Sequence, residues 1–376
     1  MEIDSSFPGG NIVVESVTDS DVWLHQDLRD TDIDWFYWYF RVNGAAGRTV
    51  RFRFTTSRAL GVRGPAVSLD SGKTWAWLGS EVLDDNSFRC SFPSGASGAS
   101  GVRLSFGMPY QESHWRQFMA EVGNNPAVLQ GILCVTEKGR DVEYVILRCA
   151  NDQPRHRVAI TCRHHCCEMM ANYVLEGLVG WILRDAAAEW LRESVEFLIV
   201  PFVDKEGVED GDQGKWRRPR DHCRDYEGDS IFASTRAIRD IIPNWGNGRI
   251  RVGLDIHCPY ISGLRNETIY LVGSHYDHID REQRRFSQIL ESSADGSLPF
   301  LAEDFLPFGE SWNTNENYAG GRGFSSWIAG FPEIMLATGI EVPYANARGV
   351  EVNQTSARRF GIDLGKGLTE YLINME

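Results

Sequence analysis

A histidine and a glutamate stand three residues apart where an apolar segment ends. The segment ITCRHHCCE, residues 160–168, leads from an expected buried strand into an expected helix. On an opening helical turn, His165 and Glu168 would lie on one side and could converge on one ion. Imidazole nitrogen and carboxylate oxygen are both ligands that Zn²⁺ accepts. His164 is a rival for His165, because it stands four residues before Glu168.

A third ligand is available at the end of a second apolar segment. The run VGLDIH ends at His257, and Asp255 shares its strand face. In open α/β sheets, functional side chains gather beyond the carboxyl ends of the strands. His257 and His165 would both lie there, and Asp255 could hydrogen-bond to a histidine ligand from behind.

Residues 111–376 alternate strand-like and helical runs, which predicts an α/β domain. Its sheet is expected to be mixed and largely parallel, with helices on both faces. The long loop 298–322 is a candidate functional loop. The expected strands are 129–136, 142–149, 157–162, 196–203, 250–257, 268–272 and 333–341, and the expected helices are 111–122, 167–192, 230–241, 277–293 and 354–374.

Residues 1–110 contain short strand-like runs separated by turn residues, which predicts an all-β sandwich domain. Residues 93–101 are expected to form a hairpin loop. The aromatic residues Trp23 and 35–40 are interpreted as core and inter-domain packing, with a carbohydrate-binding surface as the alternative. The expected strands are 11–16, 35–42, 49–55, 66–69, 74–78, 87–92 and 102–106.

The composition excludes several classes of function. A net charge of −14 argues against nucleic acid as a partner and against a polybasic membrane-binding surface. The N-terminus does not resemble a signal peptide, and no apolar run approaches the roughly 18 residues of a membrane span. The eight cysteines contain no CxxC pair, so a cysteine-only zinc site is not expected and a reduced, cytoplasmic protein is.

Four segments, taken in order, resemble one enzyme family. Residues 163–168 (RHHCCE) resemble the R-x-H-P-G-E motif of the cytosolic carboxypeptidases, zinc metallocarboxypeptidases with a β-sandwich before the catalytic domain. Residues 106–114 are similar to the P-Y-T-Y-S stretch that joins the two domains. Residues 139–145 resemble the next turn and strand, and LDIH at 254–257 resembles the D-L-H strand. The resemblance covers nearly the whole chain.

This resemblance implies one Zn²⁺ ion held by His165, Glu168 and His257, with water in the fourth position. It favours His165 over His164. Two histidines, a carboxylate and an open position form a catalytic zinc site, in which the bound water has a pKa of about 7. The implied activity is removal of a C-terminal residue, with acidic residues as candidates, from a peptide or protein.

A zinc hydrolase of this kind also needs a carboxylate that moves protons. The apolar run 333–341 ends in Glu341 and is similar to the T-x-E strand that carries the family's catalytic glutamate. Burying an unpaired carboxylate is costly, so its position there suggests a function. Glu333, at the start of the run, is the weaker candidate.

A basic run between residues 214 and 226 resembles the family's G-N-x-R and D-L-N-R-x-W motifs. The resemblance implies that Arg217 holds the scissile carbonyl oxygen, with Arg218 as the alternative. It assigns Arg224 to the C-terminal carboxylate, for which a guanidinium is well suited. Cys223 replaces the family asparagine and cannot donate hydrogen bonds as an amide does, so carboxylate recognition is less secure than zinc binding.

Tyr318 lies in the glycine-rich stretch 317–323 and matches the mobile tyrosine that closes over substrate in the family. His275 and His278 are interpreted as a helix start, with a second metal site as the alternative.

Three functions are compatible with these candidate residues. They are a zinc carboxypeptidase, a zinc amidohydrolase cleaving a non-C-terminal amide, as in a peptidoglycan fragment or an acylated amino acid, and a non-catalytic binding protein with a structural metal.

Overall fold

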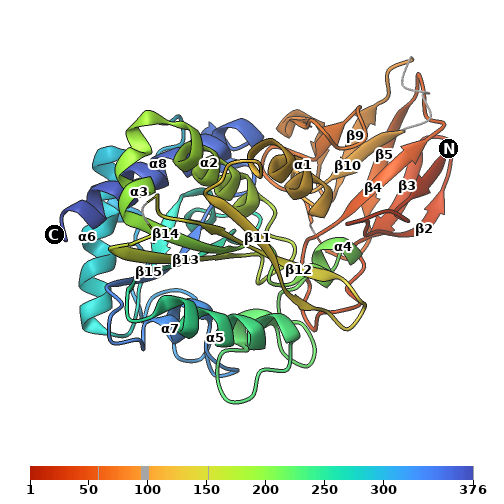
Figure 1. Ribbon diagram of the computed structural model, residues 1–376. Coiled ribbons are helices and arrows are strands. Elements are labelled where there is room, and N and C mark those ends of the chain that lie inside the picture. Colours follow the sequence, from red (N-terminus) through yellow and green to blue (C-terminus); the bar gives the residue numbers. More distant parts are fainter. Residues whose placement is uncertain (58, 95–100, 151, 376) are drawn as a thin grey trace.

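The computed structural model describes residues 1–57, 59–94, 101–150 and 152–375. A strand-rich N-terminal part precedes a larger part in which helices flank a central sheet (Figure 1). Most of residues 93–101, the predicted hairpin loop, lies outside the described residues.

The described N-terminal residues form two five-stranded sheets that pack face to face. Phe40 and Phe52, one from each sheet, have ring centroids 5.5 Å apart. Residues 36–40 are each at most 2% exposed, which confirms their interpretation as core. The first sheet contains β1 (Glu2–Asp4), β4 (Tyr39–Asn43), β10 (Val102–Ser105), β6 (Ala66–Ser68) and β7 (Ala76–Trp77), and the second contains β2 (Val13–Val17), β3 (Asp21–His25), β5 (Thr49–Phe54), β9 (Ser87–Ser91) and β8 (Leu83–Asp84).

The second part is built on a mixed sheet of seven strands among the described residues. Parallel pairing joins only the four central strands, and the outer pairings are antiparallel. The sheet is therefore mixed, as predicted, but less parallel than predicted. Its order is β11 (Val128–Val135), β12 (Asp141–Leu147), β14 (Val195–Val200), β13 (His156–Cys162), β15 (Ile250–His257), β17 (Leu336–Glu341) and β16 (Tyr270–Val272), and a separate hairpin joins β18 (Asn346–Ala347) to β19 (Val350–Glu351).

Helices cover both faces of this sheet, with α2, α3 and α8 on one side and α5 and α7 on the other (Figure 1). Twelve residues of α2 are buried, because it lies between the sheet and α8. The helices are α1 (Glu112–Val122), α2 (Met170–Arg184), α3 (Glu189–Ser194), α4 (Lys205–Asp210), α5 (Ala233–Gly246), α6 (Asp277–Ser293), α7 (Phe324–Ile328) and α8 (Gln354–Ile373).

The single helix predicted over residues 167–192 is wrong at both ends. The helix begins only at Met170 and ends before Asp185, whose extended backbone and side-chain bond to the Ala187 amide start a new turn. Short helices α4 and α7 and strands β1, β3 and β8 were not predicted, because elements of this length carry too little periodicity.

The two parts are joined by hydrogen bonds to the segment that follows α4. Asn11 Nδ2 donates to the Gly211 carbonyl at 2.7 Å, and the Tyr37 amide donates to Gln213 Oε1 at 2.8 Å. Gln213 Nε2 returns a bond to the Tyr37 carbonyl at 2.9 Å. The segment that leads into the basic run is therefore held by the N-terminal part.

None of the helices in the described ranges is both long and apolar enough to cross a membrane.

Candidate active site

His165 and Glu168 lie in a tight turn between β13 and α2, not on the first turn of a helix as predicted. The turn begins at Arg163, whose φ is +61°. The buried Arg163 guanidinium fixes it by donating to the Tyr110 carbonyl at 2.9 Å and to Asn172 Oδ1 at 2.7 Å. The two predicted ligands still converge, with His165 Nδ1 2.7 Å from Glu168 Oε1.

His257 completes the group from the end of the neighbouring strand β15. Because β13 and β15 are parallel, their carboxyl ends meet at one edge of the sheet. His257 Nδ1 lies 2.6 Å from Glu168 Oε2, so both imidazoles direct Nδ1 at one carboxylate. The ligand atoms of His165, Glu168 and His257 all lie within 4.8 Å of one another and are buried. Two imidazoles and a carboxylate in this arrangement fit a metal ion.

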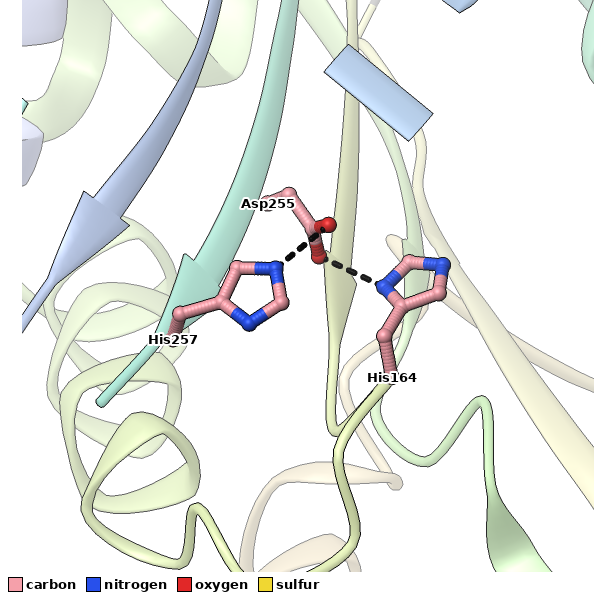
Figure 2. Close-up of side chains that lie close together, drawn as sticks. All are labelled: His164, Asp255 and His257. Carbon is pink, nitrogen blue, oxygen red and sulfur yellow. Dashed lines mark hydrogen bonds and ion pairs between the residues drawn. The ribbon is translucent and has the colours of Figure 1, made fainter. Parts of the chain in front are cut away.

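A second carboxylate, that of Asp255, hydrogen-bonds to the other ring nitrogen of His257, as the sequence suggested. Figure 2 shows Asp255 between His257 and His164, with Oδ2 2.7 Å from His257 Nε2 and Oδ1 2.8 Å from His164 Nδ1. His164 Nε2 contacts the Tyr226 hydroxyl at 2.7 Å. His164, Asp255 and His257 form a second group of metal-ligand types. Both nitrogens of His164 are paired, whereas His165 Nε2 has no hydrogen-bond partner among the described residues, which favours the group that contains Glu168 as the candidate metal site.

The first group opens onto a cavity of about 260 Å³. Six of the predicted site residues line this cavity, namely His165, Cys223, Arg224, His257, Tyr318 and Glu341. The lining includes His165, Lys215, Cys223, Arg224, His257, His275, Trp312, Tyr318, Arg322 and Glu341. Lys215 was not singled out from the sequence, although it lies within the basic run.

Glu341 ends β17 directly beside the end of β15, where it pairs in register with His257. Glu341 Oε2 is buried and has no hydrogen-bond partner among the described residues. Burial raises the pKa of Glu341 to about 7, against the lowering effect of His257, and the nearby Glu168 adds to the rise. A carboxylate of this kind can both accept and release a proton near neutral pH.

Arg224 lies in the one-turn helix His222–Arg224 and faces the same cavity. Its Nε donates to the Asn317 carbonyl at 3.1 Å and its Nη1 to the Cys223 carbonyl at 3.0 Å. The guanidinium carbon lies 4.8 Å from the ring centroid of Tyr318, whose hydroxyl donates to Asn313 Oδ1 at 3.0 Å. No carboxylate in the described part of the chain lies within ion-pair distance of Arg224. Burial opposes its charge, but the neighbouring Cys223 thiol and Asp221 outweigh burial and raise the pKa of Arg224.

Arg217 lies outside the cavity lining, in a cluster of aspartates. It donates to Asp204 Oδ2 at 2.6 Å and to Asp212 Oδ2 at 2.9 Å, and Asp30 Oδ2 lies 3.6 Å away. Arg218, the alternative, points to the surface and pairs with Asp32 at 3.1 Å. The structure therefore brings neither arginine of the first motif to the cavity.

The remaining candidates from the sequence are Glu333, His275 and His278. Glu333 lies before β17 begins and outside the cavity lining, with its carbonyl bound by Arg251. His278 is exposed in the first turn of α6, the predicted helix start, and His275 precedes it at the cavity wall. In the described ranges, neither histidine belongs to a group of metal-ligand residues.

Cys223 is 9% exposed and lines the cavity together with His165 and His257. Burial opposes ionisation of its thiol, but His165 and His257 outweigh burial and hold the pKa of Cys223 well below its ordinary value. Asp221, at the start of this segment, lies 3.9 Å from His165 Nε2. Sequence reasoning did not identify Asp221, although it matches the aspartate of the D-L-N-R motif.

No model of a protein family matches the sequence, and no curated protein matches it either. Solved structures do match. A metallo-carboxypeptidase from Burkholderia cenocepacia aligns over 100% of this chain and 99% of its own, with 20% identity and a TM-score of 0.80. A metallo-carboxypeptidase from Pseudomonas aeruginosa, solved in complex with (2-guanidinoethylmercapto)succinic acid, aligns over 100% of both chains, with 19% identity and a TM-score of 0.76.

A carboxypeptidase A from Helicoverpa armigera aligns over 72% of this chain and 74% of its own, with 16% identity and a TM-score of 0.53. The bacterial structures thus match both parts of the molecule at once, whereas the insect structure matches a smaller share. Over its whole length, this chain has the fold of the bacterial metallo-carboxypeptidases.

Proposed function

We propose that this protein is a zinc-dependent hydrolase that removes a C-terminal residue from a peptide or protein. The observation that carries the proposal is Arg224, a guanidinium with no carboxylate at ion-pair distance among the described residues, on the wall of the cavity that also contains His165, His257 and Glu341. A cation held in this way is suited to bind a carboxylate through paired hydrogen bonds.

His165, Glu168 and His257 would hold the zinc ion, and Asp255 supports His257 as a ligand. A zinc ion held there would supply Lewis acidity and lower the pKa of a water molecule bound to it. Glu341 accepts the proton of the attacking water and then delivers it to the leaving amine. Arg224 fixes the C-terminal carboxylate, and Tyr318, whose ring lies over Arg224, covers the substrate.

A peptide panel with free C-terminal carboxylates and the matching C-terminal amides tests this function. The zinc-loaded protein should release the last residue of the free acids only, and a chelator should stop the reaction until zinc is restored. The panel should include C-terminal Glu, Lys and Leu, because the acidic preference is implied only by the resemblance.

Glu341→Gln tests the proton-transfer role. It should lower kcat by about 100- to 10,000-fold while zinc content, measured by elemental analysis, stays at one ion per chain. Full turnover by Glu341→Gln on a peptide that the wild type cleaves would exclude this assignment.

Cys223 favours a second candidate, a zinc amidohydrolase acting on a non-C-terminal amide. The thiol occupies the cavity wall beside Arg224, where an amide would add donors for a carboxylate. Cleavage of blocked C-terminal amides or acylated amino acids at rates equal to those of free-acid peptides would support this candidate over the first.

Two further assignments belong to the proposal. The face-to-face packing of the N-terminal sheets supports residues 1–110 as a β-sandwich domain before a catalytic domain of residues 111–376. The eight cysteines are all free, as is usual in a reducing compartment, which supports a cytoplasmic location.

A further inference from the structure

The cation that the family pattern places on the scissile carbonyl is engaged elsewhere in this chain. Arg217 pairs with Asp204 and Asp212, and Asp30 lies within 4 Å. Asp204 and Asp212 are at most 7% exposed. Moving Arg217 into the cavity would leave the buried Asp204 carboxylate without its cation, which is strongly unfavourable, and would leave Asp212 with Arg29 alone. Arg217 is therefore fixed outside the cavity.

Lys215, two residues earlier, lines the cavity with His165, His257 and Glu341. Its ammonium nitrogen lies 6.0 Å from the ring centroid of Trp35, at the outer limit of a cation–π contact. Within the described ranges, no carboxylate forms an ion pair with it. A cation of the same basic run is thus available in the cavity.

The backbone around Lys215 is held by the N-terminal part of the chain. Thr31 Oγ1 donates to the Lys215 carbonyl at 2.7 Å, and the Gly214 amide donates to Asp30 Oδ2 at 2.8 Å. A fixed backbone with a side chain directed to the cavity is the arrangement expected of a preorganised positive group. It also gives the N-terminal part a direct role in shaping the site.

We propose that Lys215 is a catalytic residue, which donates a hydrogen bond to the scissile carbonyl oxygen as that oxygen becomes negative. This inference rests on the proposed hydrolase function. Water forms a bond to the carbonyl carbon, the carbon–nitrogen bond breaks, and the water proton passes through Glu341 to the leaving amine. Lys215 keeps its proton throughout and stabilises only the developing charge.

Lys215→Met tests the inference because methionine keeps most of the length and removes the charge. On a free-acid peptide, kcat should fall by about 100- to 1000-fold, as when an oxyanion donor is removed. KM and zinc content should stay within about threefold, and Lys215→Arg should recover part of kcat. Lys366→Met, which removes a surface lysine on α8 outside the cavity, is the matched control and should keep wild-type activity.

A second readout does not depend on turnover. A peptide phosphonate carries a stable tetrahedral anion in place of the scissile carbonyl, so Lys215→Met should weaken its binding by a similar factor. Binding of the product amino acid, measured by calorimetry, should change less than about threefold. Equal binding of the phosphonate by both proteins would overturn the role of Lys215.

A failure of the inference about Lys215 can be distinguished from a failure of the proposed function. If the wild type cleaves free-acid peptides and Lys215→Met cleaves them within twofold of the wild-type rate, the inference is wrong and the proposed function stands. If the zinc-loaded wild type cleaves no peptide of the panel, the proposed function is wrong and the inference falls with it.

Discussion

Arg217 and Arg224 stand seven residues apart in one basic run, yet they occupy opposite environments. Arg217 is enclosed by Asp204, Asp212 and Asp30 outside the cavity lining. Arg224 bonds two backbone carbonyls and faces the cavity with no carboxylate at ion-pair distance among the described residues. The same side chain is therefore held by carboxylates in one place and faces a cavity in the other, where we propose that it binds the substrate.

Arg217→Met should give the largest effect on folding. Removing one partner of a buried ion pair costs about 3–5 kcal/mol, because Asp204 would remain buried without its cation, whereas Asp212 would keep Arg29. Urea denaturation measures the loss. Arg218→Met is the control and should change the unfolding free energy by less than about 1 kcal/mol, since its pair with Asp32 is exposed. Equal losses in the two variants would contradict the distinction.

Arg224→Met should give the largest effect on free-acid peptides without unfolding the protein. Losing the charge that pairs with the substrate carboxylate should lower kcat/KM about 100-fold, or about 3 kcal/mol. Urea denaturation should show a change below about 1 kcal/mol. The C-terminal amide peptide is the control substrate. A parallel fall for the amide would show that Arg224 does not read the carboxylate.

The aspartate cluster should also make stability depend on pH. Burial opposes the charge of Asp204, but Arg217 outweighs burial and lowers its pKa from 3.8 to about 2. Because the folded-state pKa is the lower one, this stabilisation is present above pH 3.8 and is lost as the pH falls through 2. The shift corresponds to about 2 kcal/mol.

Urea denaturation of the wild type and Asp204→Asn at a series of pH values measures this contribution. The difference in unfolding free energy should narrow by about 2 kcal/mol between pH 4 and pH 2. Asp32→Asn removes an exposed partner of Arg218 and controls for loss of surface charge. A difference that stays constant over this range would mean that Arg217 does not hold Asp204 ionised.

The smallest effect is expected at Cys223, beside Arg224. Cys223→Asn would restore an amide donor near the substrate carboxylate, and one additional hydrogen bond contributes about 1 kcal/mol. KM for free-acid peptides should fall several-fold, as measured by steady-state kinetics. Cys134→Ala, a thiol outside the cavity, is the control. A higher KM in Cys223→Asn would indicate that the thiol itself contributes to binding.

Much of the larger part of the molecule, built on the seven-stranded sheet, could be predicted from the sequence. The β15 bounds were predicted without error, and those of α6 likewise, because a long apolar run and a strongly amphipathic run carry clear periodic signals. The helix over residues 167–192 was not predicted correctly, because the turn at Arg163 depends on buried hydrogen bonds to distant groups. Local propensity does not contain such contacts.

The sequence by itself determined the residue types of the site: two histidines and a carboxylate at strand ends, an acid closing an apolar strand, and a run of cations. Only the tertiary structure decided how these groups are used. It paired His164 with Asp255 and Tyr226, neutralised Arg217 with aspartates, and left Lys215 and Arg224 facing the cavity. The physical reason is that a side chain's role depends on its partners, and Asp30 reaches Arg217 only when the two parts of the chain fold together.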